Sequence, residues 1–309
     1  MSLTFVGTVA FDRIETPFGE TGKIVGGAAT YIGLSAINFV DKANLVSVVG
    51  EDFPQDALDD LDQKGIDREG LQIIEGGKTF FWHGKYHYDM NHRDTLETQL
   101  NVLDTFDPII PDSYQGTKYL MLGNLTPAVQ LSVLERLKER PKLIALDTMN
   151  LWLDTAWDDL MKVVSKVDLL TINDEEARQM SGEHSLVKAA QKILELGPKF
   201  LVIKKGEHGA LLFDKDKVFF APALPLEDIV DPTGAGDTYA GGMMGYLAQT
   251  DDISFDNLKR AVVIGSAMAS FTVEKMGTER IREVTEQDID ERIQKFIDLV
   301  DFNIELEKA

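Results

Sequence analysis

The 309-residue sequence contains no cysteine, so it can form no disulfide and offers no thiolate for catalysis or metal binding. This composition fits a reducing compartment, and we expect the protein in the cytoplasm. No stretch reaches the roughly 18 consecutive apolar residues that a membrane-spanning helix requires. Residues 1–10 lack the basic start and the apolar run of a signal peptide. We therefore expect no membrane partner.

Basic residues are scarce, with 31 Lys and Arg against 52 Asp and Glu and a formal net charge of −21. Such an excess of negative charge repels a phosphate backbone, so we expect no nucleic-acid partner. It does not exclude a phosphorylated cofactor, because backbone amides, a lysine or Mg²⁺ can hold phosphate locally in an acidic protein. With only 10 prolines and no low-complexity run, the chain is expected to fold throughout.

Apolar strands alternate with helices in the middle of the chain. The segments 119–123, 143–147 and 167–172 are almost continuously apolar, and helices are expected at 131–140 and 160–166 between them. Alternation of this kind predicts an α/β fold with a mostly parallel sheet that is covered by helices on both faces.

The most informative stretch is residues 231–242, which read DPTGAGDTYAGG. Asp231 and Pro232 interrupt regular structure, and a buried helix is expected from Thr238 onward. Between them, small residues leave the backbone uncovered at the positive end of that helix, which is a favourable place for an anion. Asp237 stands beside this place, where it could take a proton from a hydroxyl group during phosphoryl transfer. The alternative is a glycine-rich turn in which Asp237 only caps the helix.

This stretch resembles the C-terminal signature of the ribokinase-like (PfkB) carbohydrate kinases, and the similarity covers roughly residues 3–285. The resemblance implies a ribokinase-like three-layer α/β/α sandwich with a mostly parallel central sheet and a small β-sheet lid. We expect the core domain at 1–12, 26–69 and 101–309, and the lid at 13–25 and 70–100. The implied activity is ATP-dependent and Mg²⁺-dependent phosphorylation of a hydroxymethyl group on a small sugar. Asp237 would be the general base, and the transition-state charge would be held by the backbone amides of Gly234, Ala235 and Gly236.

The resemblance also assigns residues to the acceptor. Asp12, which follows the first strand, and the pair Gly26 and Gly27 match positions that hold substrate hydroxyls in the family. Tyr31 stands where the family commonly carries asparagine, so a hydroxyl-binding amide is replaced by an aromatic ring. A ring here could stack on a base or pack within its helix, which leaves a nucleoside as an alternative acceptor.

The nucleotide and its cations are assigned in the same way. Asn173 and Glu176 match an Asn-x-x-Glu motif that acts through Mg²⁺ and its waters, although acidic residues in a first helical turn are also ordinary dipole partners. Asp231 and Thr233 occupy positions that can hold a monovalent cation such as K⁺. Beside the nucleotide the resemblance places Lys205, Gly206, Gly209 and Gly277. From the sequence we assign no catalytic role to Lys204 or Lys205, since two adjacent lysines are typical of a solvated surface.

Residues 79–88 are rich in aromatic side chains. At the two-residue period of a strand, Phe80, Trp82, Tyr86 and Tyr88 share one face. Such a face needs a cover, which could be the substrate or a second subunit in a homodimer formed through the lid. A metal site at His83, His87 and His92 is disfavoured, because carboxylates at metal-site spacing are lacking apart from Asp89.

Two alternatives to a sugar kinase remain at this point. The acceptor could be a nucleoside such as adenosine, inosine or cytidine. Otherwise the chain could be a non-catalytic sensor of a sugar or a nucleotide, although the base and the anion site are both present.

Overall fold

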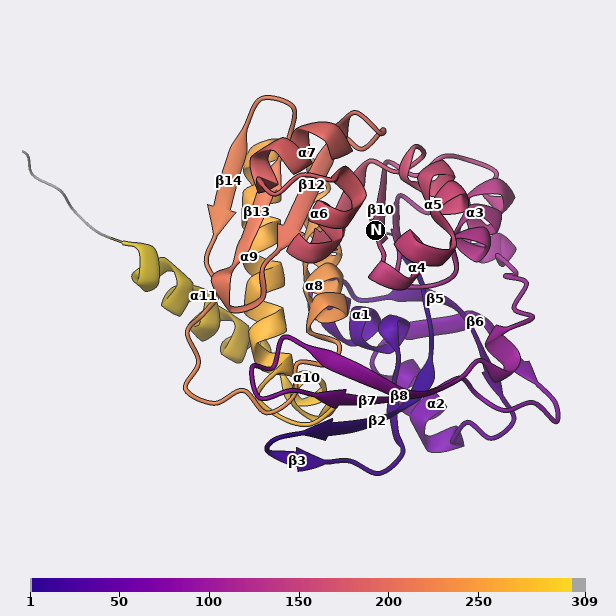
Figure 1. Ribbon diagram of the computed structural model, residues 1–309. Coiled ribbons are helices and arrows are strands. Elements are labelled where there is room, and N and C mark those ends of the chain that lie inside the picture. Colours follow the sequence, from indigo (N-terminus) through magenta and orange to yellow (C-terminus); the bar gives the residue numbers. More distant parts are fainter. Residues whose placement is uncertain (1, 302–309) are drawn as a thin grey trace, which may run out of the picture.

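A large sheet runs through the middle of the molecule (Figure 1). The computed structural model describes residues 2–301, so residues 1 and 302–309 of the expected core domain lie outside it. Within the described part of the chain the sheet has nine strands in the order β14-β13-β12-β11-β10-β9-β1-β5-β6. The strands from β12 to β6 run parallel, and β13 and β14 join antiparallel at one edge. The strands are β1 (Leu3–Val6), β5 (Ala43–Gly50), β6 (Ile66–Ile74), β9 (Tyr119–Leu122), β10 (Leu143–Asp147), β11 (Leu169–Asn173), β12 (Phe200–Lys204), β13 (Ala210–Phe213) and β14 (Val218–Ala221).

Helices cover both faces of this sheet, as the strand and helix alternation predicts. One face carries α1 (Ala28–Ala36), α2 (Gln55–Gln63), α8 (Ala235–Thr250) and α9 (Phe255–Thr272). The other face carries α3 (Pro127–Arg136), α4 (Asn150–Thr155), α5 (Trp157–Val164), α6 (Asp174–Ser181) and α7 (Leu186–Leu194). Outside α9 lie α10 (Glu279–Glu283) and α11 (Glu286–Val300), and short 3₁₀ turns are η1 (Asn101–Leu103), η2 (Asp112–Tyr114) and η3 (Gly206–His208). The expected three-layer α/β/α sandwich is confirmed.

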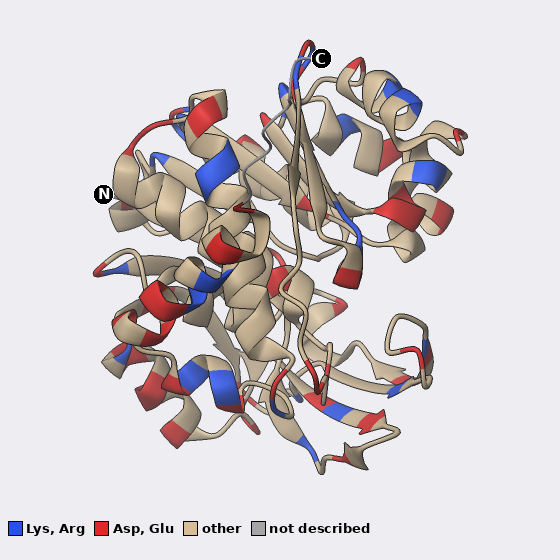
Figure 2. Ribbon diagram, turned by 90° about the vertical axis from the view of Figure 1, so that its left-hand side faces the viewer, with Lys and Arg blue, Asp and Glu red and all other residues tan. Residues whose placement is uncertain are grey.

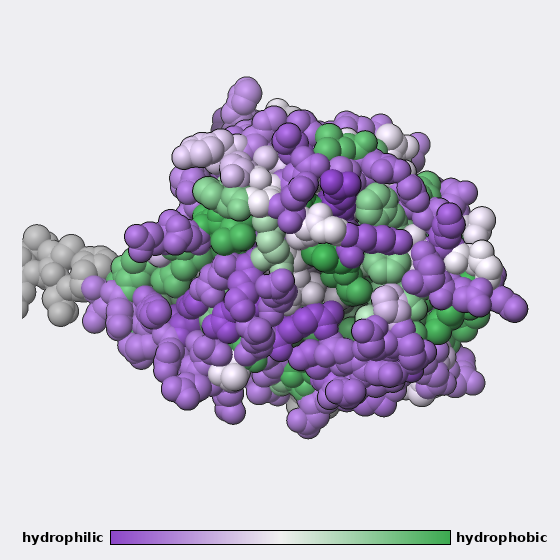
Figure 3. Space-filling view, turned by 90° about the horizontal axis from the view of Figure 1, so that it is seen from below, coloured by the Kyte–Doolittle hydropathy of each residue, from purple (hydrophilic) through white to green (hydrophobic). Residues whose placement is uncertain are grey.

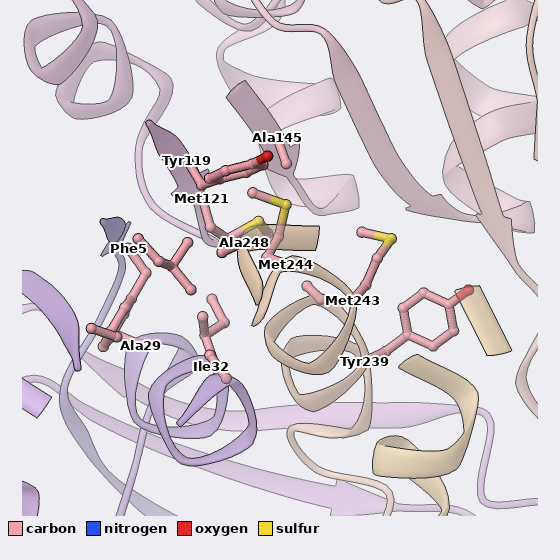
Figure 4. Packing of buried hydrophobic residues seen from close by; sticks show 14 of the residues in the cluster. Phe5, Ala29, Ile32, Tyr119, Met121, Ala145, Tyr239, Met243, Met244 and Ala248 are labelled. Carbon is pink, nitrogen blue, oxygen red and sulfur yellow. The ribbon is translucent and has the colours of Figure 1, made fainter. Parts of the chain in front are cut away.

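The buried core fixes the position of α8, which begins with residues 235–242 of the 231–242 stretch. Met243 and Met244 of α8 belong to the same buried core as Phe5 of β1, and Met244 lies beside Met121 of β9 (Figure 4). Two buried hydrogen bonds also hold Thr238 in the first turn of α8. Ser35 Oγ donates to the carbonyl of Thr238 at 2.7 Å, and Thr272 Oγ1 donates to Thr238 Oγ1 at 2.9 Å. Helices α1 and α9 therefore hold the start of α8 from two sides.

A second, smaller sheet lies at the bottom of the view in Figure 1. It has the order β3-β2-β7-β8, with β4 also paired to β2. Its extent differs from the expected lid at three boundaries. Gly26, expected in the core domain, belongs to the lid strand β4. Residues 10–12 belong to the lid strand β2, and residues 70–74 belong to β6 of the main sheet. The pairing of residues 70–74 with residues 46–50 of β5 continues the core strand past the expected boundary. The strands are β2 (Ala10–Thr16), β3 (Gly19–Glu20), β4 (Ile24–Gly26), β7 (Phe81–Tyr86) and β8 (Arg93–Gln99).

Only part of the expected aromatic face of the lid is turned toward the core, because β7 ends at Tyr86 and Tyr88 beyond it is 84% exposed. Tyr86 is buried, and its hydroxyl lies 3.3 Å from Thr233 Oγ1 beside the start of α8. Asp12 is paired in register with Trp82, and Arg93 with Tyr86, so these side chains share that inner face. The molecular face seen from below, where β2 and β3 lie in Figure 1, is mostly hydrophilic (Figure 3).

Charged residues are spread over the helices and loops in the view of Figure 2. On the lid, His83 Nε2 lies 3.0 Å from Glu15 Oε1, and His87 Nε2 lies 3.0 Å from Asp94 Oδ2. Across residues 2–301, no group of three or more His, Asp or Glu residues has the arrangement of a metal site. None of the described helices combines the length and the apolar character needed to cross a membrane.

Candidate active site

The site forms where the carboxyl ends of the central strands meet the first turn of α8, with the lid above. Gly234 precedes the helix with a φ of +75°, in the left-handed region that glycine tolerates best. The amide of Ala235 donates to the carbonyl of Pro232 at 3.2 Å. Among the described residues we find no acceptor for the amides of Gly234, Gly236 and Asp237. Of the three amides expected to hold the transition-state charge, those of Gly234 and Gly236 have no acceptor in the described chain, and that of Ala235 donates within the turn.

Asp237 lies in this first turn, and its buried Oδ1 atom has no hydrogen-bond partner in the described part of the chain. Burial raises the pKa of its carboxyl group to about 7, and the negative charge of Asp147 adds to this shift. Lys204 and Arg93 oppose it, while Asp12 reinforces it. A carboxylate with a pKa near neutrality can accept a proton from a hydroxyl group at physiological pH.

Asp12 lies in the lid strand β2 and is 4% exposed. Its Oδ2 accepts a hydrogen bond from the amide of Gly27 at 3.1 Å. A Cβ atom on Gly26 would lie 1.9 Å from that same oxygen, so only glycine leaves room for the carboxylate. Burial raises the pKa of Asp12 to about 7, the Gly27 amide lowers it, and Asp231 raises it further. The structure thus brings Asp12, Gly26 and Gly27 together at the lid side of the site.

Tyr31, in the first turn of α1, is 1% exposed. Its ring lies against Gly234, and its hydroxyl oxygen has no hydrogen-bond partner among the described residues. Burial raises the pKa of this hydroxyl well above its ordinary value, and the carboxylates of Asp12, Asp231 and Asp237 add to the shift. In this arrangement the ring presents no open face to a nucleobase, because the start of α8 covers it.

Asp231 connects the start of the motif to the loop after α9. Its Oδ1 accepts from the amide of Thr233 and its Oδ2 from the amide of Gly277, each at 2.8 Å. Burial raises the pKa of this carboxyl, while the Gly277 amide opposes the shift. Gly277 has a φ of +56° and is buried beside Ile24 of the lid strand β4. The expected cation residues Asp231 and Thr233 therefore lie together, next to the expected nucleotide residue Gly277.

Asn173 and Glu176 bond to each other at the start of α6. The Asn173 side chain accepts from the Glu176 amide at 2.8 Å, and Glu176 Oε2 accepts from the Asn173 amide at 2.8 Å. This is a capping box, which stabilises the helix start. Burial raises the pKa of Glu176 to about 7, Asp147 adds to the shift, and Lys204 opposes it.

The loop after β12 contains the other residues expected at the nucleotide. The amide of Lys205 donates to the carbonyl of Gly209 at 2.8 Å, and both Gly206 and Gly209 have positive φ angles of +55° and +80°. The lid reaches this loop, since a Cβ atom on Gly206 would lie 3.0 Å from Asn91 Oδ1 in the turn between β7 and β8. The tip of the lid therefore lies next to this loop.

Three charged residues of the site were not assigned from the sequence. Lys204, at the end of β12, forms an ion pair with Asp147, at the end of β10, with 2.9 Å between Nζ and Oδ1. Burial alone would lower the pKa of Lys204, but Asp147, Glu176 and Asp237 outweigh it and raise the pKa, so the side chain stays charged. The third is Arg93 of β8, whose charge lowers the pKa of Asp237 and of Glu176.

The alternation of side chains along the strands contains part of the signal that would have placed Lys204 and Asp147 in the site. Val202 and Ala145 belong to the core on the α8 side of the sheet, so Lys204 and Asp147, two residues further along their strands, point to that same side. The alternation of side chains could have turned Lys204 inward. It could not have shown that the active site lies there.

The fold and this arrangement of carboxylates around a helix start define a class of α/β phosphotransferases with an alcohol acceptor. The model of the pfkB family carbohydrate kinases matches residues 5–284, and the chain belongs to this family. It is 34% identical over 253 residues to the cytidine kinase of Thermococcus kodakarensis, covering 80% of this chain and 88% of that one. It is 29% identical over 294 residues to the nucleoside kinase of Methanothermobacter thermautotrophicus, covering 90% and 91%.

Solved structures have the same fold. The nucleoside kinase of Methanocaldococcus jannaschii superposes with a TM-score of 0.76 at 22% identity, covering 95% of this chain and 98% of that one. The ribokinase of Giardia lamblia superposes with a TM-score of 0.79 at 16% identity, covering 96% and 99%. The expected family, fold class and kinase activity are confirmed.

Proposed function

We propose that the protein transfers the γ-phosphoryl group of ATP to a hydroxymethyl group of a small sugar or a nucleoside, with Asp237 as the general base. The observation that carries this proposal is the carboxylate of Asp237, with one oxygen unpartnered among the described residues, in the first turn of α8 beside free backbone amides. Asp237 takes the hydroxyl proton, and the amides at the helix start hold the charge on the phosphoryl group as it moves. Asp12, with Gly26 and Gly27, holds other hydroxyl groups of the acceptor.

The donor set at the strand ends fits Mg²⁺. This ion prefers oxygen ligands and keeps several waters, and Glu176 and Asp147 offer carboxylate oxygens close to each other's charge. One oxygen of Glu176 is committed to the Asn173 amide, which favours contact through water. When bound with ATP, the ion would neutralise phosphate charge.

The nucleotide would lie along the loop of Lys205, Gly206 and Gly209, with Gly277 at its other border. We assign K⁺ to Asp231 and Thr233, because the buried carboxylate of Asp231 meets only backbone amides and no cationic side chain among its bonded partners in the described chain. Comparing the turnover number in K⁺ with that in Na⁺ at equal ionic strength tests this assignment. Equal rates in both salts would argue against it.

A nucleoside acceptor is favoured by a specific observation on the lid. The ring of Trp82 lies across Gly84, where a Cβ atom would come within 2.0 Å of it, and Trp82 stands beside Asp12 on the inner face. A flat aromatic surface beside the residue that holds the acceptor suits stacking on a nucleobase. The relatives named cytidine kinase and nucleoside kinase support the same choice.

We further propose a homodimer formed through the lid and a location in the cytoplasm, where ATP is available. The lid exposes Phe18 and Leu96, at 61% and 50%, which a second subunit could cover. Light scattering after size exclusion would give the mass of the assembly, and a monomer at micromolar concentration would contradict the dimer.

The function is tested by measuring ADP release with MgATP and a panel of acceptors. The panel contains ribose, fructose, 2-keto-3-deoxygluconate, adenosine, inosine and cytidine, each with and without K⁺. We expect turnover with one class of acceptor, and a loss of about 10²–10⁴-fold in the Asp237→Asn variant with nucleotide binding retained. Full turnover in this variant would show that Asp237 is not the base. ATP binding without turnover of any acceptor would support the alternative that the protein is a non-catalytic sensor.

A further inference from the structure

Lys204 is a largely buried lysine that lies against the first turn of α8. Its side chain is 16% exposed and that of its partner Asp147 is 9% exposed. A Cβ atom on Gly236 would lie 3.2 Å from Lys204 Nζ, a tight contact, so the ammonium group lies directly beside the first turn of α8. The ammonium group is therefore fixed beside the backbone amides that face the transferred group.

The hydrogen-bonding capacity of this ammonium group is only partly used. An ammonium group has three N–H donors, and among the described residues Nζ bonds to the Asp147 carboxylate alone. Two donors remain for a ligand in the site. An anion with several oxygens, such as a phosphoryl group, matches donors that lie next to a helix start.

A second lysine and aspartate pair shows what a structural pair looks like in this sheet. Lys199 and Asp168 stand just before the neighbouring strands β12 and β11, at the amino ends of those strands and so far from Lys204. Lys199 Nζ lies 3.0 Å from Asp168 Oδ1, and the Lys199 side chain is 69% exposed. There the cation stays in water and needs no further partner. Burying the ammonium group of Lys204 has a desolvation cost that a surface pair avoids, and an apolar pair could fill the same space without it. The buried charge thus points to a ligand.

We propose that Lys204 is a catalytic residue that donates hydrogen bonds to the non-bridging oxygens of the transferred phosphoryl group, and that Asp147 positions it. This inference rests on the proposed function. In the step, the acceptor hydroxyl gives its proton to Asp237 while its oxygen forms a bond to the γ-phosphorus. The bond from that phosphorus to the β–γ bridging oxygen breaks, and its electron pair leaves with ADP. Lys204 remains protonated throughout and acts through its charge.

The test compares Lys204→Met and Lys204→Gln with the matched control Lys199→Met. Methionine keeps much of the length and removes the charge, and glutamine can still bond to Asp147 if the methionine variant does not fold. We expect kcat to fall about 10²–10³-fold in both Lys204 variants, as for loss of one transition-state donor. The affinity for MgADP and the KM of the acceptor should change by less than about fivefold, since the lost contact is made mainly in the transition state. Lys199→Met should keep kcat within about twofold.

The pH profile supplies a readout that a structural role would not move. The charged groups that act on Asp237 come from four elements: Asp12 of β2, Arg93 of β8, Asp147 of β10 and Lys204 of β12. Glu176 of α6 acts on Lys204. Removing the Lys204 cation removes a charge that favours ionised Asp237. The acid limb of kcat/KM should therefore move to higher pH in Lys204→Gln and stay in place in Lys199→Met.

The outcomes separate this inference from the proposed function. A folded Lys204 variant with kcat within threefold of the wild type, or with an unmoved acid limb, would overturn the role of Lys204 and leave Asp237 chemistry intact. A loss confined to MgADP affinity would also overturn it. Absence of turnover by the wild-type protein would overturn the proposed function and this inference with it.

Discussion

The ring of Tyr31 lies face-on against the α-carbon of Gly234. A Cβ atom on Gly234 would come within 2.5 Å of three ring carbons. Tyr31, at the position where the family commonly has asparagine, thus packs its ring against the turn before α8. This packing restricts position 234 to glycine.

Replacing Gly234 by alanine should destabilise the protein and lower kcat. The positive φ alone costs an alanine about 1–2 kcal/mol, and the collision with the Tyr31 ring adds to it. Gly182→Ala is the matched control, because Gly182 has a φ of +70° and a Cβ atom added there would meet no heavy atom within 4 Å. Urea denaturation of both variants should show the larger loss for Gly234→Ala. Equal losses would mean that the ring moves aside freely.

Replacing Tyr31 by phenylalanine should leave the free energy of unfolding unchanged or raise it. The Tyr31 hydroxyl has no partner among the described residues, so its removal gives up no hydrogen bond and relieves a buried polar group. Tyr114→Phe provides the contrast, since the Tyr114 hydroxyl contacts Asp67 and the amide of Gly70 and its loss should cost about 1–2 kcal/mol. A loss above about 1 kcal/mol in Tyr31→Phe would contradict the prediction.

The pH dependence of stability should report on Asp237. Its folded pKa of about 7 is above the ordinary value of 3.8, so between these values the folded state binds more protons than the unfolded state. The contribution of Asp237 to the free energy of unfolding therefore falls as the pH rises from about 4 to 7, and it is lowest above pH 7. Asp237→Asn removes this titration. Compared with the wild type, the ligand-free variant should gain stability as the pH rises from 5 to 8, which denaturation at several pH values would measure. A constant difference would show that the pKa is not raised.

Replacing Trp82 by alanine should weaken binding of a nucleoside more than of a free sugar. Stacking of a base on an aromatic ring contributes about 1–3 kcal/mol, so the KM of a nucleoside should rise roughly 5- to 150-fold, whereas that of ribose should change little. Trp157→Ala is the control, since Trp157 lies on α5 and is 40% exposed. If both classes of acceptor lost affinity equally, Trp82 would be a general part of the lid rather than a surface for a base.

The sequence was sufficient for those parts of the fold that short-range patterns determine. The strand and helix alternation predicted the covered parallel sheet, and the glycine-rich turn predicted the start of α8 together with Asp237. The lid boundary at residue 70 was wrong because β6 is an edge strand, so its pairing with β5 depends on long-range contacts. Composition along the chain does not record which sheet a strand joins.

The charged side chains that point into the site were harder to predict for a related reason. Lys204 follows a buried strand and is followed by Lys205, a pattern that also occurs where a strand leaves the core for water. Its partner Asp147 is 57 residues earlier in the chain, and only the order of strands in the sheet brings the two together. Arg93 lies in a lid strand without a buried face, so no periodicity marks it.

The turn between β7 and β8 affects how the acceptor would enter the site and how the products would leave it. Asp12, in the lid strand β2, is 4% exposed. The tip of the same lid reaches Gly206, and His92 Nε2 lies 3.8 Å from Glu175 Oε1 of α6. One sheet thus covers the proposed acceptor side with its strands and the proposed nucleotide side with its tip. For the proposed function, entry of the acceptor and departure of either product would both require that sheet to move away, so a single opening motion would set the rate of exchange on both sides.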